Sequence, residues 1–394
     1  MRSHNSHFIT NFVAKKRKNR NFGLFRQQKS ESAEATQTKI NMAEKIRIKD
    51  IAEKAGVSVG TVDRILHNRP NVSAKARAKV EEVLKEINYE PNSYASALAS
   101  NKECHFWVVM PKYDAGTYWE EIADGAKKCV VVRRDFNIDL QFCFYERFDT
   151  ESFKKACKEV LDKRPDGVVL VPSTLEATKT FTDVLHNRNT PFVMLDSYMP
   201  DLRPLTFYGQ DSFQSGYFAA KMLMLLAAKD KEILMMKQTK DGIVASKQQD
   251  NREVGFRHYM HDHFPNVKIW TIDLPLYDGV EAYDNKLDDF FLKHPKVNYC
   301  ITMSSKAHII GEYLLRTNKR DKQMMGYDMT PRNAECLRNG SICFLIAQHA
   351  YKQGYSCVDA LVKAVILHRE VTPVNYVPLE ILARENMDFY DALE

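Results

Sequence analysis

The sequence predicts a small all-α domain with a helix-turn-helix, followed by a two-lobed α/β module with parallel sheets. Within residues 46–91, apolar residues recur at helical spacing and a glycine separates two short helical stretches. From residue 104 to 390, short apolar runs alternate with amphipathic stretches, which is typical of parallel sheets built from β-α-β units. Such a length is large for one doubly wound sheet, so we expect two lobes.

The positive charge of the chain lies almost entirely at its N-terminal end. Residues 1–41 hold nine Lys and Arg against two Glu, so the other 353 residues sum to about −1 of the total +6. A generally basic surface is therefore not evidence for a nucleic-acid partner. Residues 1–45 are either a disordered arm that adds phosphate contacts or upstream sequence read from an early start codon. The chain offers no signal peptide and no membrane-spanning stretch, so a cytoplasmic location is expected.

Three short helices are expected in the first domain. Gly56 is placed to end the first helix in a left-handed conformation, and Ser58 to cap the second. A third helix begins at Ser73. The apolar residues expected to face inward from the first two helices are Ile48, Ile51, Ala52, Ala55, Val62, Ile65 and Leu66.

The amino-acid sequence of this region resembles that of the DNA-binding headpiece of the lactose-repressor family. The matching pieces are Asp50-Ile51-Ala52, Ala55-Gly56-Val57-Ser58, Thr61-Val62, Arg64, Val72-Ser73, Asn88-Tyr89 and Pro91-Asn92. The resemblance implies a homodimer on double-stranded operator DNA, with a recognition helix from about Val59 to His67 in the major groove.

The same resemblance assigns DNA-contacting roles to individual residues. Base-reading positions are Val59, Gly60 and Arg64, and phosphate contacts are Ser58, Thr61 and Asn71. A hinge helix and linker would occupy 92–103, where Asn92 is a further contact and Leu98 would insert into the minor groove.

Asp63 departs from the family, which usually has Ser at this position. A carboxylate repels the DNA backbone, so it must turn away, pair with Arg64 or Arg69, or accept a hydrogen bond from a cytosine amine.

The second part of the chain places polar and aromatic residues after its predicted strands, where ligands bind in parallel sheets. Such side chains suit polyols, because aromatic faces stack on sugar rings and carboxylates, amides and Arg bridge hydroxyls. The candidate effector-binding residues are Tyr118, Trp119, Ser173, Asp196, Asp211, Arg252, Asp278, Ser304, Asp328 and Gln348.

This part resembles the sugar-type periplasmic-binding fold that completes lactose-repressor-family proteins. The resemblance rests on Asp211 with Gly216, Arg252 with Gly255, Gln348, and the turn Gly326-Tyr327-Asp328. It implies one lobe from 104–229 plus 349–370, another from 230–347 plus 371–390, and three crossings between them. It also implies a transcription regulator, expected to be a repressor, whose operator affinity depends on a sugar or sugar derivative.

Lys306 is a second departure from the family. The sequence reads Ser304-Ser305-Lys306 where the family usually has an Asn-Asp pair. Lys306 either points to solvent, which is the favoured interpretation, or points inward beside Arg252, in which case an acidic or phosphorylated sugar becomes plausible.

Other classes of function receive little support. The sequence contains no G-x-S-x-G, no phosphate-binding Gly-rich loop and no H-E-x-x-H, so neither an enzyme nor a cofactor is expected. His258, His261 and His263 are read as a polar helix surface, not a metal site, and the eight cysteines carry no assigned chemistry. The stronger alternative is a sugar-binding transport receptor, because the second part alone would fit one.

Overall fold

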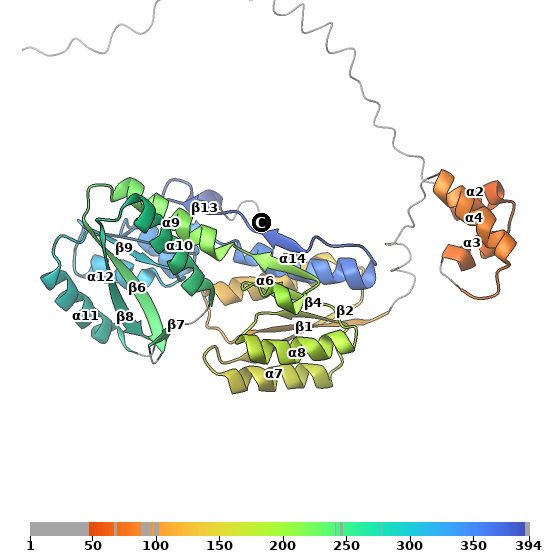
Figure 1. Cartoon of the computed structure of the whole chain (residues 1–394), viewed down its shortest axis with the longest axis horizontal. Coiled ribbons are helices and arrows are strands. Elements are labelled where there is room, and N and C mark those ends of the chain that lie inside the picture. Colours follow the sequence, from red (N-terminus) through yellow and green to blue (C-terminus); the bar gives the residue numbers. More distant parts are fainter. Residues whose placement is uncertain are drawn as a thin grey trace, which may run out of the picture. The chain divides into compact units, whose positions relative to one another are not determined.

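The computed structural model describes residues 47–66, 69–87, 94, 97, 102–240, 242–244, 247–276 and 278–390. The chain divides into two compact units, with the boundary between residues 91 and 92. Figure 1 labels most of the helices and many of the strands of both units. The predicted tail 1–45 and the DNA-contact candidates Asn92 and Leu98 lie outside the described residues.

The first unit is a three-helix domain of α2 (Ile48–Ala55), α3 (Val59–Leu66) and α4 (Ala74–Glu86). Ile51, Val62 and Val80 meet in its core and are fully buried. Gly56 ends α2 with φ +63°, a conformation that costs glycine little. The predicted helix-turn-helix is therefore confirmed.

The first sheet of the second unit is entirely parallel, in the order β12-β5-β4-β3-β1-β2. Its strands are β1 (Cys104–Pro111), β2 (Ile138–Tyr145), β3 (Gly167–Leu170), β4 (Phe192–Leu195), β5 (Thr206–Gly209) and β12 (Val374–Tyr376). The helices α6 (Tyr118–Val132) and α14 (Ala350–Leu361) cover one face, and α7 (Thr150–Asp162) and α8 (Leu175–Asn187) cover the other.

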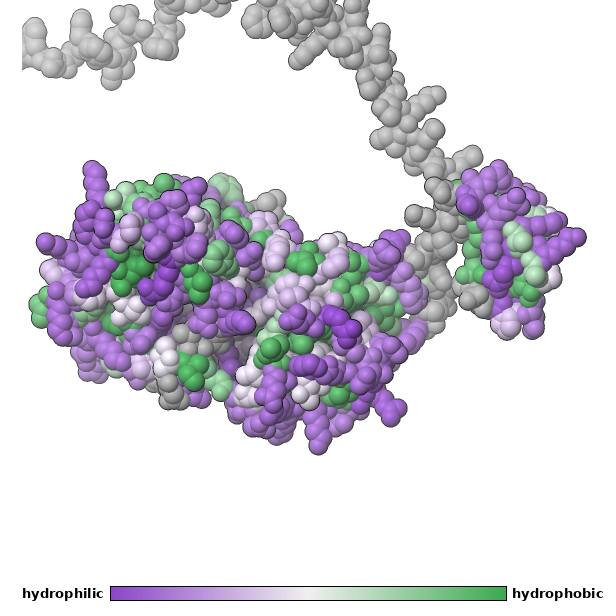
Figure 2. All heavy atoms as spheres, viewed as in Figure 1, coloured by the Kyte–Doolittle hydropathy of each residue, from purple (hydrophilic) through white to green (hydrophobic). Residues whose placement is uncertain are grey.

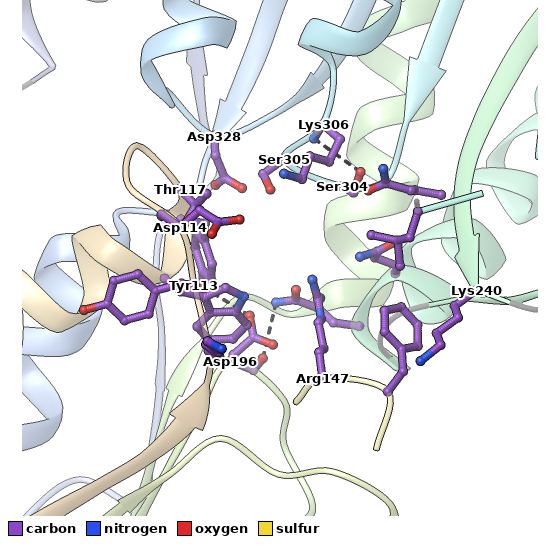
Figure 3. Close-up of a pocket in the computed structure, with 18 of the residues that line it drawn as sticks. Tyr113, Asp114, Thr117, Arg147, Asp196, Lys240, Ser304, Ser305, Lys306 and Asp328 are labelled. Atoms are coloured by element: carbon purple, nitrogen blue, oxygen red, sulfur yellow. Dashed lines mark hydrogen bonds between the residues drawn. The ribbon is translucent and has the colours of Figure 1, made fainter. Parts of the chain in front are cut away.

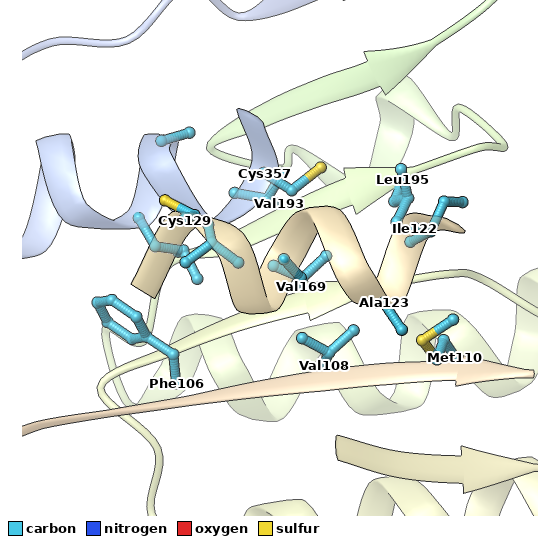
Figure 4. Packing of buried hydrophobic residues seen from close by; sticks show 14 of the residues in the cluster. Phe106, Val108, Met110, Ile122, Ala123, Cys129, Val169, Val193, Leu195 and Cys357 are labelled. Carbon is cyan, nitrogen blue, oxygen red and sulfur yellow. The ribbon is translucent and has the colours of Figure 1, made fainter. Parts of the chain in front are cut away.

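The central strand β1 supplies both faces of this lobe's core. Phe106, Val108 and Met110 point to the α6 side, as Figure 4 shows, while Val109 joins the opposite cluster. This alternation follows from the two-residue period of a strand. Because both faces are covered, β1 reads as a nearly continuous apolar run.

The second sheet has the order β13-β11-β10-β9-β6-β7, with β8 paired to β6. Only the pairs β6–β7 and β11–β13 are antiparallel among its described strands. The strands are β6 (Glu232–Lys240), β7 (Ile243–Val244), β8 (Lys268–Pro275), β9 (Tyr299–Thr302), β10 (Gln323–Tyr327), β11 (Ile342–Ala347) and β13 (Glu380–Leu382). The helices are α9 (Ser212–Leu226) and α10 (Lys247–His263) on one face, and α11 (Val280–Lys293), α12 (His308–Arg316) and α13 (Pro331–Arg338) on the other.

The chain passes between the lobes three times: after β5, after β11 and after β12. Two predicted lobe boundaries need correction. The helix α9 packs on the second sheet, so the first crossing precedes residue 212 instead of following 229. The strand β12 pairs with β5, so it belongs to the first lobe.

Close packing against α10 explains where α9 lies. A Cβ atom on Gly216 would sit 1.8 Å from the Arg252 carbonyl oxygen, and one on Gly255 would sit 2.0 Å from that of Phe213. The two glycines thus let the two helix backbones touch, which fixes α9 to the second lobe.

The histidines and cysteines that stand out in the sequence lie on the surface or in the packed interior. His258 and His261 both lie beside Asp262, and His263 lies 3.1 Å from the Tyr217 hydroxyl. Across the ranges that the structure describes, no group of three or more His, Cys, Asp or Glu side chains could hold a metal. All eight cysteines are free and seven are buried.

No described helix has both the length and the apolar character needed to cross a bilayer. Figure 2 shows mainly hydrophilic residues on the face in view, with smaller hydrophobic patches.

Candidate functional site

The helix α3 presents its predicted base-reading residues outward. Val59 is 48% exposed, and Gly60 and Arg64 are also exposed, while Val62 and Ile65 on the opposite face are buried. An amphipathic helix of eight residues therefore leaves one face available for a partner.

The residues predicted to contact phosphates lie around this face. Ser58 Oγ accepts a hydrogen bond from the Thr61 N–H at 3.2 Å, and the two hydroxyl oxygens are 2.9 Å apart. Ser58 is exposed and Thr61 is half-buried. Asn71 is exposed as well, with φ +68°, a conformation that Asn adopts more readily than most residues.

Asp63 forms an ion pair with Arg69, the arginine beyond the end of α3. The distance from Asp63 Oδ2 to Arg69 Nη1 is 3.2 Å. Of the alternatives that the sequence left open, the structure shows this pairing. The pair reduces the repulsion that a bare carboxylate would exert on a DNA backbone.

The second unit contains a cleft of about 420 Å³ between its two sheets, at the carboxyl ends of the strands. Seven of the predicted effector residues line it: Tyr118, Trp119, Asp196, Arg252, Ser304, Asp328 and Gln348. All seven are less than 9% exposed, and they come from both lobes. Seven of the ten predicted effector residues thus lie together at the strand ends.

Arg252, on α10, forms hydrogen bonds with several other residues at the cleft. It is 1% exposed, and its guanidinium lies 3.9 Å from the centre of the Tyr327 ring. It donates to the Met303 carbonyl oxygen at 3.0 Å, to Gln210 Oε1 at 3.2 Å and to Gln348 Oε1. Its Nε is buried and has no hydrogen-bond partner among the described atoms. A buried donor of this kind favours a ligand that carries an acceptor.

Two buried carboxyl groups face the same space. Burial raises the pKa of Asp328 to about 7, although the Arg252 charge and a 2.9 Å hydrogen bond from Gln348 act in the opposite direction. Burial also raises the pKa of Asp196, which accepts a hydrogen bond from the Tyr118 hydroxyl at 3.2 Å. Carboxyl groups whose pKa values are shifted by burial cluster at functional sites, so these two support a binding role for the cleft.

Three predicted effector residues lie elsewhere. Ser173 lines a neighbouring cavity of about 460 Å³, which shares Trp119 and Arg147 with the cleft. Asp211 caps α9 by accepting from the Gln214 N–H at 2.9 Å, and borders a third cavity of about 210 Å³. Asp278 pairs with Lys286 at 3.4 Å and lines none of these three cavities.

Lys306 lines the cleft instead of pointing to solvent, so the favoured interpretation of the sequence was wrong at this position (Figure 3). Sequence reasoning also missed other lining residues: Lys112, Tyr113, Asp114, Thr117, Glu146, Arg147, Phe148, Asp149, Gln238, Lys240, Gln248, Gln249, Leu276 and Ser305. Glu146, Arg147 and Phe148 follow β2, and Leu276 follows β8. Apolar residues at alternate positions of β2, from Ile138 to Phe144, are the signal that could have led to Arg147.

An outward-facing recognition helix and a two-lobed module with a polar cleft define the architecture of DNA-binding regulators that carry a ligand-binding domain. Comparison with known proteins agrees. Residues 47–92 match the family of bacterial regulatory proteins, lacI family, and residues 106–367 match a periplasmic binding protein domain. The chain belongs to the lacI family of DNA-binding transcription regulators, and is thereby distinguished from enzymes and from transport receptors.

Individual relatives support the same assignment. A crystal structure of a Bacteroides fragilis protein described as a LacI transcriptional regulator is 40% identical, with a TM-score of 0.71 over 73% of this chain and 100% of that one. Catabolite control protein A of Staphylococcus aureus is 29% identical over 149 residues, which are 38% of this chain and 43% of that protein. This chain thus matches less than half the length of that curated relative. GanP, a glucose-galactose binding protein from Geobacillus stearothermophilus, shares the fold at 19% identity, with a TM-score of 0.62 over 73% of this chain and 99% of that one.

Proposed function

We propose that this protein is a homodimeric repressor that reads an operator with α3 and releases or retains it according to a sugar-type effector in the cleft. The observation that carries the proposal is the outward face of α3, where Val59, Gly60 and Arg64 are exposed on a helix whose other face is buried. A helix of this size fits the major groove.

Each outward residue has a distinct role in this proposal. Arg64 can donate two hydrogen bonds to a guanine, which is worth about 1–3 kcal/mol of discrimination against other bases. Val59 offers an apolar contact to a thymine methyl group, and Gly60 lets the backbone approach the base edges. Ser58 and Asn71 then contact phosphates and set the register of the helix.

A sugar-type effector suits the chemistry of the cleft. Asp328, Gln348 and Arg252 form a connected polar set that can bridge neighbouring hydroxyls, and Trp119 provides an aromatic surface. Proteins of similar fold support the same class, since two carbohydrate or solute binding proteins were crystallised with D-arabinose.

Two helices connect the cleft to the hinge segment. The helix α6 begins with Tyr118 in the cleft and is followed by Arg133, which donates to the Tyr94 hydroxyl at 3.1 Å. Arg133 also pairs at 2.6 Å with Asp359 on α14, the helix that begins two residues after Gln348. A ligand that moves the cleft ends of α6 and α14 therefore shifts the position of Tyr94, and typical couplings of this kind are about 1–3 kcal/mol.

The dimer would place two α3 helices on the half-sites of a palindrome. Val131 and Val132, at the end of α6, are 63% and 50% exposed and offer an apolar surface to a second copy. Sedimentation equilibrium measures whether the protein is a dimer. A monomer at micromolar concentration would contradict the proposal that it binds DNA as a dimer.

The test of the whole proposal is DNA selection followed by fluorescence anisotropy. Purified full chain is incubated with a random-site DNA library, and the enriched sequence is titrated with and without a panel of sugars at several salt concentrations. We expect one sequence to bind far more tightly than its scrambled version, and one sugar to change that affinity. Binding that depends only on salt and not on sequence would contradict it.

A further inference from the structure

Two positively charged side chains enter the cleft from opposite lobes. Arg147 lies two residues after β2 in the first lobe, and Lys306 lies four residues after β9 in the second. Both line the cleft and both are half-buried. In Figure 3 the labelled acids Asp114, Asp196 and Asp328 lie on the left, and Arg147, Lys240 and Lys306 lie on the right. We call the region of Arg147, Lys240 and Lys306 the basic side of the cleft, although the lining also includes Glu146 and Asp149 close to Arg147 in the sequence.

Neither cation is neutralised within the described part of the chain. No described carboxylate oxygen lies within 4.0 Å of a charged nitrogen of Arg147 or Lys306. The Arg147 guanidinium lies 5.8 Å from the centre of the Trp119 ring. By contrast, Lys112 at the rim of the same cleft pairs with Glu146 at 3.4 Å.

The surroundings of Arg147 and Lys306 disfavour the charged form of each side chain. Burial lowers the pKa of Lys306, and the positive charges of Arg147 and Arg332 lower it further, against a smaller opposite effect of Asp114. Burial likewise lowers the pKa of Arg147, although Asp196 acts in the opposite direction. Unpaired charges away from water are costly, so an anion placed between them would stabilise both.

The neighbouring cavity extends this basic side. Besides Arg147 it is lined by Lys240 and Lys247, and Asp196 is the one carboxylate among its described lining residues. Thr174, which precedes α8, makes no side-chain cap for that helix, and it lines the same cavity. The N–H groups of a helix start favour negative charge, so the region has room and donors for an anionic group.

We propose that the effector is a sugar derivative carrying a carboxylate or a phosphate, and that this group bridges Arg147 and Lys306. This rests on the proposed function of the cleft as an effector site. The hydroxyls of the ligand would meet Asp328, Gln348 and Arg252, and the anionic group would meet the basic side. Since Arg147 and Lys306 belong to different lobes, binding of the anion would also draw the lobes together.

Isothermal titration of the full chain with matched sugars tests the proposal. Each set holds a neutral sugar, its uronic or aldonic acid, and its phosphate ester, for example galactose, galacturonate and galactose 6-phosphate. We expect one anionic member of a set to bind at least about tenfold more tightly than its neutral parent, as one charge-assisted contact allows. Which anionic member binds distinguishes a carboxylate from a phosphate.

The variants Arg147→Met and Lys306→Met remove one charge each and keep the side chain long. Each is expected to abolish most of the preference for the anion over the neutral sugar. Lys293→Met is the matched control, because Lys293 pairs with Asp289 at 2.7 Å and lines none of the three cavities, and it should keep the preference. Inorganic phosphate serves as a second probe, and it should raise the melting temperature of the wild type more than that of either variant.

The outcomes separate the two proposals. If a neutral sugar binds as tightly as its anionic derivatives, or if both variants keep the preference, this inference is wrong and the effector site stands. If no sugar of any charge binds and phosphate gives no shift, the proposed function of the cleft fails with it.

Discussion

Replacing Asp328 with Asn should stabilise the ligand-free protein at alkaline pH while weakening its binding of sugars. Asp328 follows β10, is 3% exposed, and has φ +68°. Asn adopts this backbone conformation readily and can still accept the hydrogen bond that Gln348 donates at 2.9 Å. The substitution therefore removes a negative charge with little change of shape.

The expected size follows from the pKa. Burial raises the pKa of Asp328 from its ordinary 3.8 to about 7 in the folded protein. As the pH rises between these values, the unfolded chain ionises first and the folded state loses stability. The loss is complete above the folded pKa, and a shift of about three pKa units corresponds to about 4 kcal/mol. Asp328→Asn avoids this loss, so its advantage over the wild type grows with pH.

Thermal unfolding of ligand-free protein, followed by circular dichroism at pH 5 and pH 8, measures the effect. At pH 8 we expect the melting temperature of the variant to exceed that of the wild type by up to about 10 °C, with a smaller difference at pH 5. Asp211→Asn is the matched control, because Asp211 is half-exposed and Asn also caps helices well. Titration with the best-binding sugar should show weaker binding to Asp328→Asn, since an amide replaces a carboxylate that accepts from hydroxyls.

The reasoning would be refuted by an Asp328→Asn variant that is less stable than the wild type at pH 8. A variant whose stability depends on pH as steeply as that of the wild type would refute it equally, because Asp328 would then not be the titrating group.

Three further predictions concern the first unit and the hinge. Arg64→Ala should weaken binding to the selected operator by about 1–3 kcal/mol in an anisotropy titration, whereas Lys85→Ala, on the outer face of α4, should not. Ile51→Ala should cost the three-helix unit about 2–5 kcal/mol, because Ile51 is fully buried, and calorimetry should show the melting of the second unit unchanged. Tyr94→Phe removes the acceptor of the Arg133 hydrogen bond, worth about 1 kcal/mol, and should reduce the effect of the ligand on DNA affinity while the ligand Kd stays the same.

Local patterns in the sequence were sufficient to predict the first unit. The spacing of Ile51 and Val62, with Gly56 between them, specifies two helices and the turn that joins them. The burial of one face then determines which side chains remain outside. Such features depend only on residues a few positions apart, which is why the exposed position of Arg64 could be inferred.

The lobes of the second unit depend on contacts between distant residues. A periodic stretch such as Ser212–Ala228 reads as a helix, but the sequence does not say on which sheet it packs. The contact between Gly216 and the Arg252 backbone settles this, and it joins segments 36 residues apart. The strand β12 was assigned to the other lobe for the same reason, since its partner β5 precedes it by more than 160 residues.

The cleft residues that the sequence did not predict have a simpler explanation. The strand β2 is an edge strand with polar residues at Asp139 and Gln141, so it lacks the continuous apolar run that marks the central strands. The sequence pattern therefore does not mark Arg147 as a residue that follows a strand. The orientation of Lys306 depends on a loop conformation that no local pattern specifies.

The most direct test of the central claim is the ratio of affinities of the full chain for its selected DNA sequence and for a scrambled duplex of equal length, measured at one salt concentration. The account predicts that the selected sequence binds about a thousandfold or more tightly than the scrambled duplex, as is typical of sequence-specific DNA-binding proteins. Equal affinities, with and without sugars, would mean that α3 does not read base sequence.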